Sequence, residues 1–293
     1  RFVRKFEARF AKKFKVKYAI SVNSATSGLS AALGAANIGP GDEVITTCLS
    51  FNATAMSILS VNAIPVFVDV DDKTFCVDPN KIEKAITGNT KAILVVHLLG
   101  NAADMDRIME IGKKHKLIVI EDAAQAPGTM YGDKYVGTVG DIGIFSLQET
   151  KNIMTGEGGM VVTENPYYAK KIRMIRNHGE SIPDNTWSED DLVNLVGLNY
   201  RMTELTAAIG LAQLEKLEDN NRIRKENAKF LKEGLSDIPG IYIPKRKKGE
   251  VPHIFAMLYD HNIIGVERYR ILAALRAEGI PVGSGYLRLM YEN

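Results

Sequence analysis

Residues 140–163 have the sequence GDIGIFSLQETKNIMTGEGGMVVT, with two short apolar runs on either side of a polar connection. The runs at 141–147 and 160–163 have the length and the β-branched content of strands. Between them the chain presents Lys151 and then a glycine-rich segment at 155–159, which permits positive φ and close backbone approach. A lysine on a short loop between two strands is therefore the first candidate for a functional group.

Short apolar runs alternate with helical stretches on the amino-terminal side of this segment. The predicted strands cover residues 18–22, 43–47, 65–70, 91–98 and 117–121, and the predicted helices cover 27–36, 53–61, 78–85 and 105–114. On the carboxyl side we predict helices over 166–178, 203–236 and 265–278 and a strand over 253–259. The alternation is typical of an α/β protein with helices on both faces of its sheet.

Composition and charge exclude several classes of protein. The 293 residues are 45% hydrophobic and 25% charged, as in ordinary globular proteins. A net charge of +2 gives no general case for a nucleic-acid partner. No run approaches the ~18 apolar residues of a membrane span. Cys48 and Cys76 form no disulfide framework, and as free thiols they suit a reducing cytoplasm.

The positive charge is concentrated in residues 1–17, RFVRKFEARFAKKFKVK. Phenylalanines recur there at every fourth position, which predicts an amphipathic helix docked by an apolar stripe. Targeting, membrane contact and partner contact remain as alternatives for this basic segment.

Polar groups at predicted strand ends suggest a ligand site, because α/β proteins bind ligands at the carboxyl ends of strands. Asp122 follows the strand at 117–121, and residues 23–27 (NSATS) open a helix whose free N–H groups suit an anion. A plain salt bridge between Asp122 and Lys151, and plain helix capping by Ser24 or Thr26, are the simpler interpretations.

One cofactor would use all these groups. Pyridoxal phosphate (PLP) has an aldehyde for a lysine, a ring nitrogen for a carboxylate and a phosphate for an anion site. Phe51, near another strand end, would be a flat partner for its ring.

Other chemistry finds less support. No His, Cys or carboxylate cluster has metal-ligand spacing, so we predict no metal. The glycine runs at 137–140 and 156–159 do not form G-x-G-x-x-G, which counts against a dinucleotide site. We expect His97 to be a structural residue near the cofactor, and His178 to cap a helix or contact substrate.

Several stretches in a fixed order span nearly the whole chain. They are VNSATSGLSAAL (22–33), GDEVITTCLSFNATA (41–55), PVFVDVD (65–71), VVHLLGNAADMD (95–106), IEDAAQAPG (120–128), GDIGIFSLQETKNIMTGEGGMVVT (140–163) and GLNYRMTELTAAIGLAQL (197–214). Together they resemble the sugar aminotransferases of the DegT/DnrJ/EryC1/StrS family. The resemblance implies the fold of the fold-type I PLP-dependent transferases, a mostly parallel mixed sheet sandwiched by helices. It also implies a large PLP-binding domain over 1–235 and a smaller α/β C-terminal domain over 236–293, incomplete in this chain.

The resemblance implies a role for each matched residue. Lys151 matches the lysine that binds the cofactor covalently, Asp122 the partner of the pyridine nitrogen, and Gln125 an amide near the ring. Phe51 matches the aromatic residue that stacks on the ring. The residues implied to hold the phosphate are Ser24, Ala25, Thr26, Ser146 and, from the neighbouring subunit, Asn199. Ala25, Leu99 and Pro127 depart from the residues frequent in the family at those positions.

The family's activity is transfer of an amino group from an amino acid to a keto-sugar. We expect L-glutamate as donor and a nucleotide-linked acceptor, in amino-sugar biosynthesis for a surface polysaccharide or a secondary metabolite. A cytoplasmic homodimer with active sites at the interface is implied. Lys151 argues against the dehydratase branch, in which histidine replaces this lysine. The alternatives are a catalytically idle sensory or regulatory member, and an adaptor that binds an acidic partner through residues 1–17.

Overall fold

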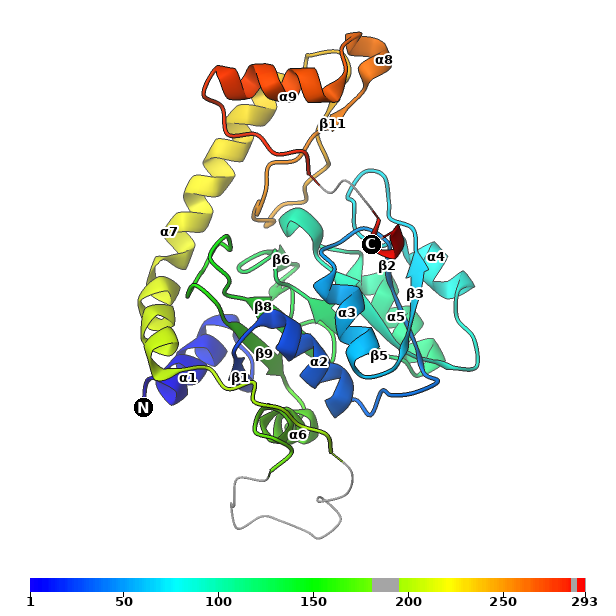
Figure 1. Ribbon diagram of the computed structural model, residues 1–293, viewed down its shortest axis with the longest axis vertical. Helices are drawn as coiled ribbons and strands as arrows, with labels where there is room; N and C mark the ends of the chain where they lie inside the picture. The colour runs from blue at the N-terminus through cyan, green and yellow to red at the C-terminus, as the bar shows by residue number, and fades with distance from the viewer. Residues whose placement is uncertain (181–194, 286–288, 293) are drawn as a thin grey trace.

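A seven-stranded, mostly parallel sheet forms the centre of the molecule (Figure 1). The computed structural model describes residues 1–180, 195–285 and 289–292. Across the sheet the order is β1 (Tyr18–Val22), β9 (Gly159–Thr163), β8 (Ile142–Ser146), β5 (Ile118–Asp122), β4 (Thr90–Val96), β2 (Glu43–Thr47) and β3 (Ile64–Val68). β9 is antiparallel to both of its neighbours, and the other pairs are parallel. The predicted α/β class and mixed sheet are confirmed.

Helices cover both faces of the sheet, because alternate strand residues point to opposite sides. On one face Ile20, Leu94 and Ile144 belong to a core shared with α2 (Ala25–Ala35), α3 (Ala53–Ser60) and α6 (Pro166–Arg176). On the other face Ile93 and Phe145 lie in two cores. The helices that complete them are α1 (Phe2–Phe14), α4 (Pro79–Lys84), α5 (Met105–His115) and the first half of α7 (Glu204–Leu235).

The aromatic stripe of α1 is part of the core. Phe6, Phe10 and Phe14 are fully buried, whereas Phe2 at the start of the helix is 41% exposed. Phe10 and Phe14 stack with their ring centroids 4.3 Å apart, and both contact Phe145 of β8. The predicted docked helix over the basic segment is confirmed.

The basic face of α1 lies against acidic side chains of α7. Arg9 pairs with Glu215 at 2.6 Å, Lys13 pairs with Glu218, and the amino-terminal ammonium group pairs with Glu204 at 2.7 Å. Exposed pairs of this kind contribute little to stability, because water and salt screen them. These basic groups therefore face α7 of the same chain, which does not favour the adaptor alternative.

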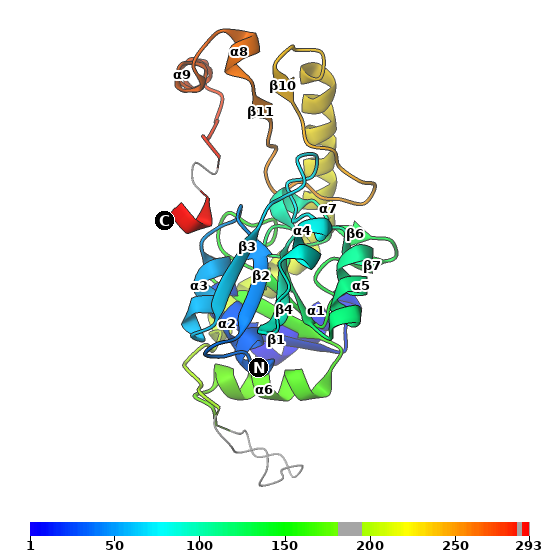
Figure 2. The same ribbon diagram turned by 90° about the vertical axis from the view of Figure 1, so that its right-hand side faces the viewer.

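Short elements connect and follow these layers. They are the 3₁₀ turn η1 (Leu98–Gly100), β6 (Met130–Tyr131), β7 (Lys134–Tyr135), β10 (Ile241–Tyr242), β11 (Leu258–Tyr259), α8 (His261–Ile264), α9 (Arg268–Ala277) and the 3₁₀ turn η3 (Met290–Glu292). α7 extends from the sheet towards α8 and α9 (Figures 1 and 2). The predicted domain boundary follows the last residue of α7, and the division into two domains stays a prediction.

The predicted strand over 253–259 is wrong except for its last two residues, which form β11. The amide of His253 instead donates to the Leu99 carbonyl at 3.0 Å, a contact outside any strand ladder. Residues 251–253 are buried beside η1 and do not pair with a strand of the sheet.

In the three described segments of the chain, none of the helices combines the length and the apolar character that crossing a bilayer would need.

Candidate active site

The register of the sheet brings most of the predicted site residues to one edge. Asp122, the last residue of β5, pairs with Val96 of β4 and Ile144 of β8. Gly159 at the start of antiparallel β9 lies opposite both Val22, at the end of β1, and Ser146, at the end of β8. Segments that leave β1, β5 and β8 therefore emerge side by side, as expected for a ligand site in an α/β sheet.

Asp122 is a buried carboxylate with its own hydrogen-bond donors. The Thr54 hydroxyl donates to Oδ2 at 2.9 Å, and the Ala124 amide donates to Oδ1 at 3.1 Å. Burial raises the pKa of Asp122, while these two donors and the charge of Lys151 oppose the rise. A cationic N–H placed against this carboxylate would be strongly bound, because the site is shielded from water.

Lys151 lies in a tight loop between β8 and β9. Its amide donates to the Gln148 carbonyl at 2.9 Å, and the Thr155 amide donates to the Leu147 carbonyl at 2.7 Å, which closes the loop. Burial lowers the pKa of Lys151, and the negative charge of Asp122 partly offsets this. The amine is thus easier to deprotonate than an exposed lysine.

Lys151 and Asp122, both described residues, are not joined by an N–O contact of 4.0 Å or less. The two groups nevertheless act on each other electrostatically. The plain salt bridge that the sequence left open is therefore not formed, and the two charges are free to bind the opposite ends of one group.

The amino end of α2 forms a compact, polar turn beside this pair. Ser24 caps the helix by accepting a hydrogen bond from the Ser27 amide at 3.1 Å. Ala25 and Thr26 then occupy the first helical positions, where backbone N–H groups point out of the helix. Capping and anion binding use the same geometry here, since the helix end also has a partial positive charge.

Gly159 allows β9 to approach this helix end. A Cβ built on Gly159 would lie 2.7 Å from the carbonyl carbon and oxygen of Ser24 and 2.8 Å from the Ala25 nitrogen. Ser146, which pairs with Gly159, is buried beside it. The helix end at Ser24 and Ala25 and the strand end at Ser146 thus meet at Gly159.

Gln125 and Phe51 lie on the segments that follow β5 and β2. Gln125 is buried, and its carbonyl oxygen accepts from the Leu99 amide at 2.8 Å. Leu99, the donor, has a positive φ of 60°. Phe51 is 65% exposed, so its ring is available to stack on a ligand.

Asn199 is exposed, and both its backbone and its side chain contact its own chain, since its Oδ1 accepts from the Arg201 amide at 3.4 Å. Its carbonyl accepts from the side chain of Asn23 at 3.3 Å, next to the turn at Ser24. The predicted reach of its side chain to a neighbouring subunit stays a prediction.

Glu121 is the buried charged residue that the sequence reasoning missed. It accepts from the Gly137 amide at 2.7 Å, from the Val139 amide at 2.7 Å and from the Gly140 amide at 2.6 Å. His97 lies 2.8 Å away through Nε2, and its Nδ1 accepts from the Ala103 amide at 3.2 Å. His97 has the structural position expected of it. The available signal was a glutamate within an otherwise apolar strand.

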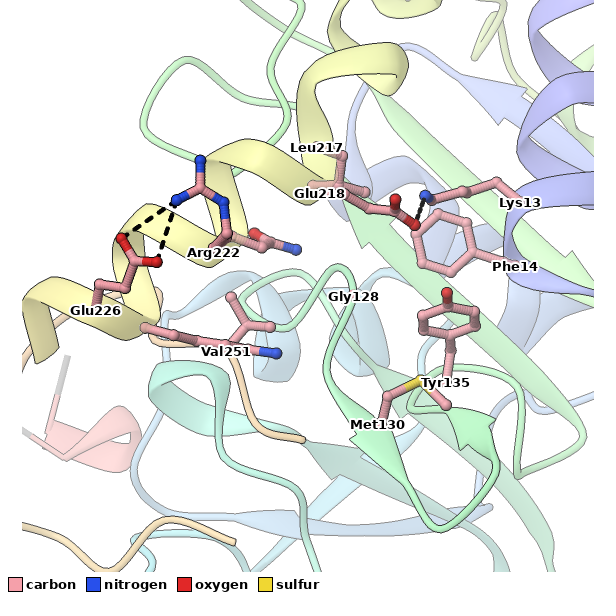
Figure 3. A pocket seen from close by; sticks show the side chains of 12 residues that line it. Lys13, Phe14, Gly128, Met130, Tyr135, Leu217, Glu218, Arg222, Glu226 and Val251 are labelled. Carbon is pink, nitrogen blue, oxygen red and sulfur yellow. Dashed lines mark hydrogen bonds and ion pairs between the residues drawn. The ribbon is translucent and has the colours of Figure 1, made fainter. Parts of the chain in front are cut away.

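A cavity of about 390 Å³ lies apart from these residues, between α1, α7 and the β6–β7 hairpin (Figure 3). Its lining includes Phe14, Tyr135 and Leu217, with the Lys13–Glu218 and Arg222–Glu226 ion pairs at its rim. It contains none of the predicted cofactor residues. No cluster of possible metal ligands occurs among the residues that the structure describes.

A lysine, a shielded carboxylate and a helix amino end at one sheet edge fit the aldehyde, ring nitrogen and phosphate of PLP. With this fold, they define a PLP-dependent transferase. The family model for the DegT/DnrJ/EryC1/StrS aminotransferase family matches residues 1–293, and the chain belongs to this family.

Two curated relatives and one solved structure illustrate the relationship. The chain is 39% identical over 285 residues to the spore coat polysaccharide biosynthesis protein SpsC of Bacillus subtilis, covering 94% of this chain and 73% of SpsC. It is 46% identical over 225 residues to the GDP-perosamine synthase of Caulobacter vibrioides, covering 77% of this chain and 59% of the synthase. The crystal structure of NtdA from Bacillus subtilis with bound cofactor PMP matches with a TM-score of 0.90 and 32% identity, covering 100% of this chain and 66% of NtdA.

The chain is therefore a PLP-dependent sugar aminotransferase by family and by fold. The comparisons give no support to the catalytically idle alternative.

Proposed function

We propose that this chain transfers the amino group of L-glutamate to a nucleotide-linked keto-sugar, in the biosynthesis of an amino sugar for a surface polysaccharide or a secondary metabolite. The observation that supports this most is the relation of Lys151 to Asp122. Each group shifts the pKa of the other, although the two do not form an ion pair. Asp122 ends one strand of the sheet and Lys151 follows the neighbouring strand, beside the amino end of α2. The name of the GDP-perosamine synthase relative supports a nucleotide-linked sugar as acceptor.

In this proposal, residues at this edge of the sheet would hold the cofactor. Asp122 binds the ring nitrogen and keeps it protonated, and the donors Thr54 and Ala124 hold the carboxylate in place. Phe51 would stack on the ring, and Gln125 would lie near it. The phosphate is held by Ser24, Ala25, Thr26 and Ser146, and by Asn199 of a neighbouring subunit in a homodimer.

When bound, PLP supplies an electron sink that stabilises the negative charge left on carbon after proton removal. The amine of Lys151 is the group that moves this proton. Because burial lowers its pKa, the amine loses its proton more easily than an exposed lysine does, and in its unprotonated form it accepts the α-proton of the donor. The ammonium form would then deliver this proton to a different atom, C4′ of the bound cofactor, so one residue would be base and acid in turn.

Lys151 moves a proton in the opposite direction when the keto-sugar accepts the amino group. The reaction therefore consists of two alternating half-reactions. The amino acid leaves as its 2-oxo acid before the keto-sugar binds, so the kinetics are ping-pong. The large domain over 1–235 contains these residues, the segment 236–293 forms the smaller domain, and the protein works in the cytoplasm.

The test is a separate assay of each half-reaction. Purified PLP-loaded protein is mixed with L-glutamate alone, and 2-oxoglutarate is measured per active site. The amino-loaded protein is then offered a panel of GDP- and TDP-linked keto-sugars. Lys151→Ala should abolish both halves, while Lys134→Ala, which alters an exposed lysine on β7, should leave both intact. Normal turnover by Lys151→Ala would contradict the assigned role.

A further inference from the structure

Four segments that are distant in the sequence meet at the residue that follows Lys151. Asn152 is 3% exposed, and its side-chain nitrogen lies 3.2 Å from Oδ1 of Asn221 on α7. The nitrogen of Asn221 lies 2.9 Å from the carbonyl oxygen of Pro127, after β5. The oxygen of Asn152 lies 3.3 Å from Nδ1 of His253. The loop of Lys151 is thus tied to three other parts of the chain.

Pro127, Asn221, Asn152 and His253 form a chain of hydrogen bonds, called the relay below. The direction of each bond in it follows from the Pro127 carbonyl. The Pro127 carbonyl can only accept, so Asn221 must turn its NH₂ group towards it and its oxygen towards Asn152. Asn152 must then donate to Asn221, which leaves its own oxygen facing His253. Nδ1 of His253 therefore has the proton, and Nε2 has the lone pair.

The backbone is shaped to permit the first contact. Gly128 has a φ of +93°, and a Cβ at this position would lie 2.3 Å from the side-chain nitrogen of Asn221. Gly128 faces α7 at the edge of the cavity (Figure 3). A side chain at this position would push the Asn221 amide away from Pro127.

The surroundings of His253 disfavour its cationic form. His253 is 9% exposed, and the Arg224 guanidinium donates to its carbonyl oxygen at 3.1 Å. Burial, followed by the positive charges of Lys151 and Arg224, lowers the pKa of His253 to about 3. The imidazole therefore remains neutral at any pH at which an enzyme of this type works.

We propose that Asn221 and His253 are positioning residues for Lys151. The relay through Asn152 fixes the loop from which the lysine projects, and it keeps a neutral imidazole, with an unprotonated Nε2, beside the lysine. The neutral imidazole then adds no positive charge to the surroundings of Lys151. This inference rests on the proposed role of Lys151. It adds Asn221 of α7 and His253 before β11, which act on Lys151 through Asn152.

The proton position on His253 is measured in cofactor-free protein with ¹⁵N-labelled histidine, by NMR that correlates ring protons with ring nitrogens. The variant His253→Gln assigns the signal among the five histidines of the chain, because its signal disappears. We expect a protonated Nδ1 and an unprotonated Nε2 from pH 8 down to about pH 5. A proton on Nε2, or an imidazolium in this range, would overturn the inference.

The effect on Lys151 is measured with Asn221→Asp, which cannot donate to Pro127 and adds a negative charge. Asn220→Asp adds the same charge one residue earlier on α7 and is the matched control. With PLP added, the pH midpoint of the visible absorbance of the lysine-bound cofactor should rise by about half a unit or more for Asn221→Asp. The rate of 2-oxoglutarate formation should fall about tenfold, with little change in the KM for glutamate.

An unchanged absorbance midpoint in Asn221→Asp, or the same change in Asn220→Asp, would contradict the proposal. His253→Leu removes the donor to Asn152 without adding a charge and should shift the midpoint, whereas His253→Gln retains a neutral donor and should keep the wild-type midpoint. This pair provides a second test if Asn221→Asp does not fold. The NMR and absorbance measurements need neither glutamate nor sugar. They therefore distinguish failure of the relay from failure of the proposed reaction.

Discussion

Nε2 of His97 and Oε2 of Glu121 lie 2.8 Å apart with both side chains fully buried, and Glu121 directly precedes Asp122 in β5. Because the Ala103 amide donates to Nδ1, the proton of a neutral imidazole is on Nε2 and is donated to Glu121. Glu121 thus fixes His97 and the 137–140 turn on one side of β5, while Asp122 faces the site on the other.

Replacing Glu121 by glutamine should destabilise the protein. The glutamine NH₂ group would meet backbone N–H donors of the 137–140 turn, leaving buried donors unpaired. We expect a loss of about 3 kcal/mol in the free energy of unfolding, measured by urea titration. Glu218→Gln, at an exposed pair with Lys13, should cost less than about 1 kcal/mol. Equal effects in the two variants would contradict the structural role of Glu121.

The aromatic stripe of α1 predicts that Phe10→Ala lowers the free energy of unfolding much more than Phe2→Ala does. Phe10→Ala removes a fully buried ring that contacts Phe14 and Phe145, and should cost about 3–5 kcal/mol of unfolding free energy. Phe2→Ala alters a ring that is 41% exposed and should cost less than half as much. The same urea titration compares them, and similar losses would mean that α1 is not docked as described.

Gly159→Ala should weaken cofactor binding. Its Cβ would meet backbone atoms of Ser24 and Ala25, which cannot move without displacing the amino end of α2. We expect PLP affinity to fall about tenfold or more, measured by fluorescence titration of the cofactor-free protein. Gly39→Ala is the control, since its Cβ would meet nothing within 4 Å. An unchanged PLP affinity would show that the helix end does not hold the phosphate.

Asp122→Asn should change how stability depends on pH. Burial raises the pKa of Asp122, so the folded state binds this proton more tightly than the unfolded state does. Its contribution to stability is therefore complete below the unfolded pKa, about 3.9, and is lost as pH rises through the folded pKa. In cofactor-free protein, the variant should lose less stability than wild type between pH 4 and pH 7.

Urea titrations across that pH range measure the difference, and Asp133→Asn at an exposed position is the control. The Asp122→Asn variant should also lose amino transfer, because a neutral amide does not hold the ring nitrogen in its protonated form. Parallel stability curves for wild type and Asp122→Asn would mean that burial does not raise the pKa of this carboxyl.

Much of the sheet and its covering helices could be predicted because their signals are local. The strands and helices from residue 18 to residue 163 follow from apolar periodicity, and Asp122 and Lys151 were found because they follow apolar runs. The strand predicted over 253–259 failed although those residues are mostly apolar. His253 donates to the Leu99 carbonyl beside Gly100, whereas Ile254, Met257 and Leu258 are 46%, 38% and 47% exposed, so most of this apolar run is not buried in a sheet.

The hydrogen-bonded relays could not be predicted. Asn152 and Asn221 are 69 residues apart, and Glu121 meets backbone amides of a turn whose own sequence gives no sign of a partner. Such contacts depend on how layers pack together. A single sequence records the polar residues involved but not which of them meet.

The central claim, that Lys151 moves the proton during transfer from an amino acid, is tested most directly by one measurement. PLP-loaded protein is mixed with L-glutamate in a stopped-flow spectrometer, and the loss of the cofactor's visible band is followed together with 2-oxoglutarate formation. The account predicts one 2-oxoglutarate per bound cofactor for wild type and none for Lys151→Ala. Stoichiometric product from Lys151→Ala at the wild-type rate would contradict it.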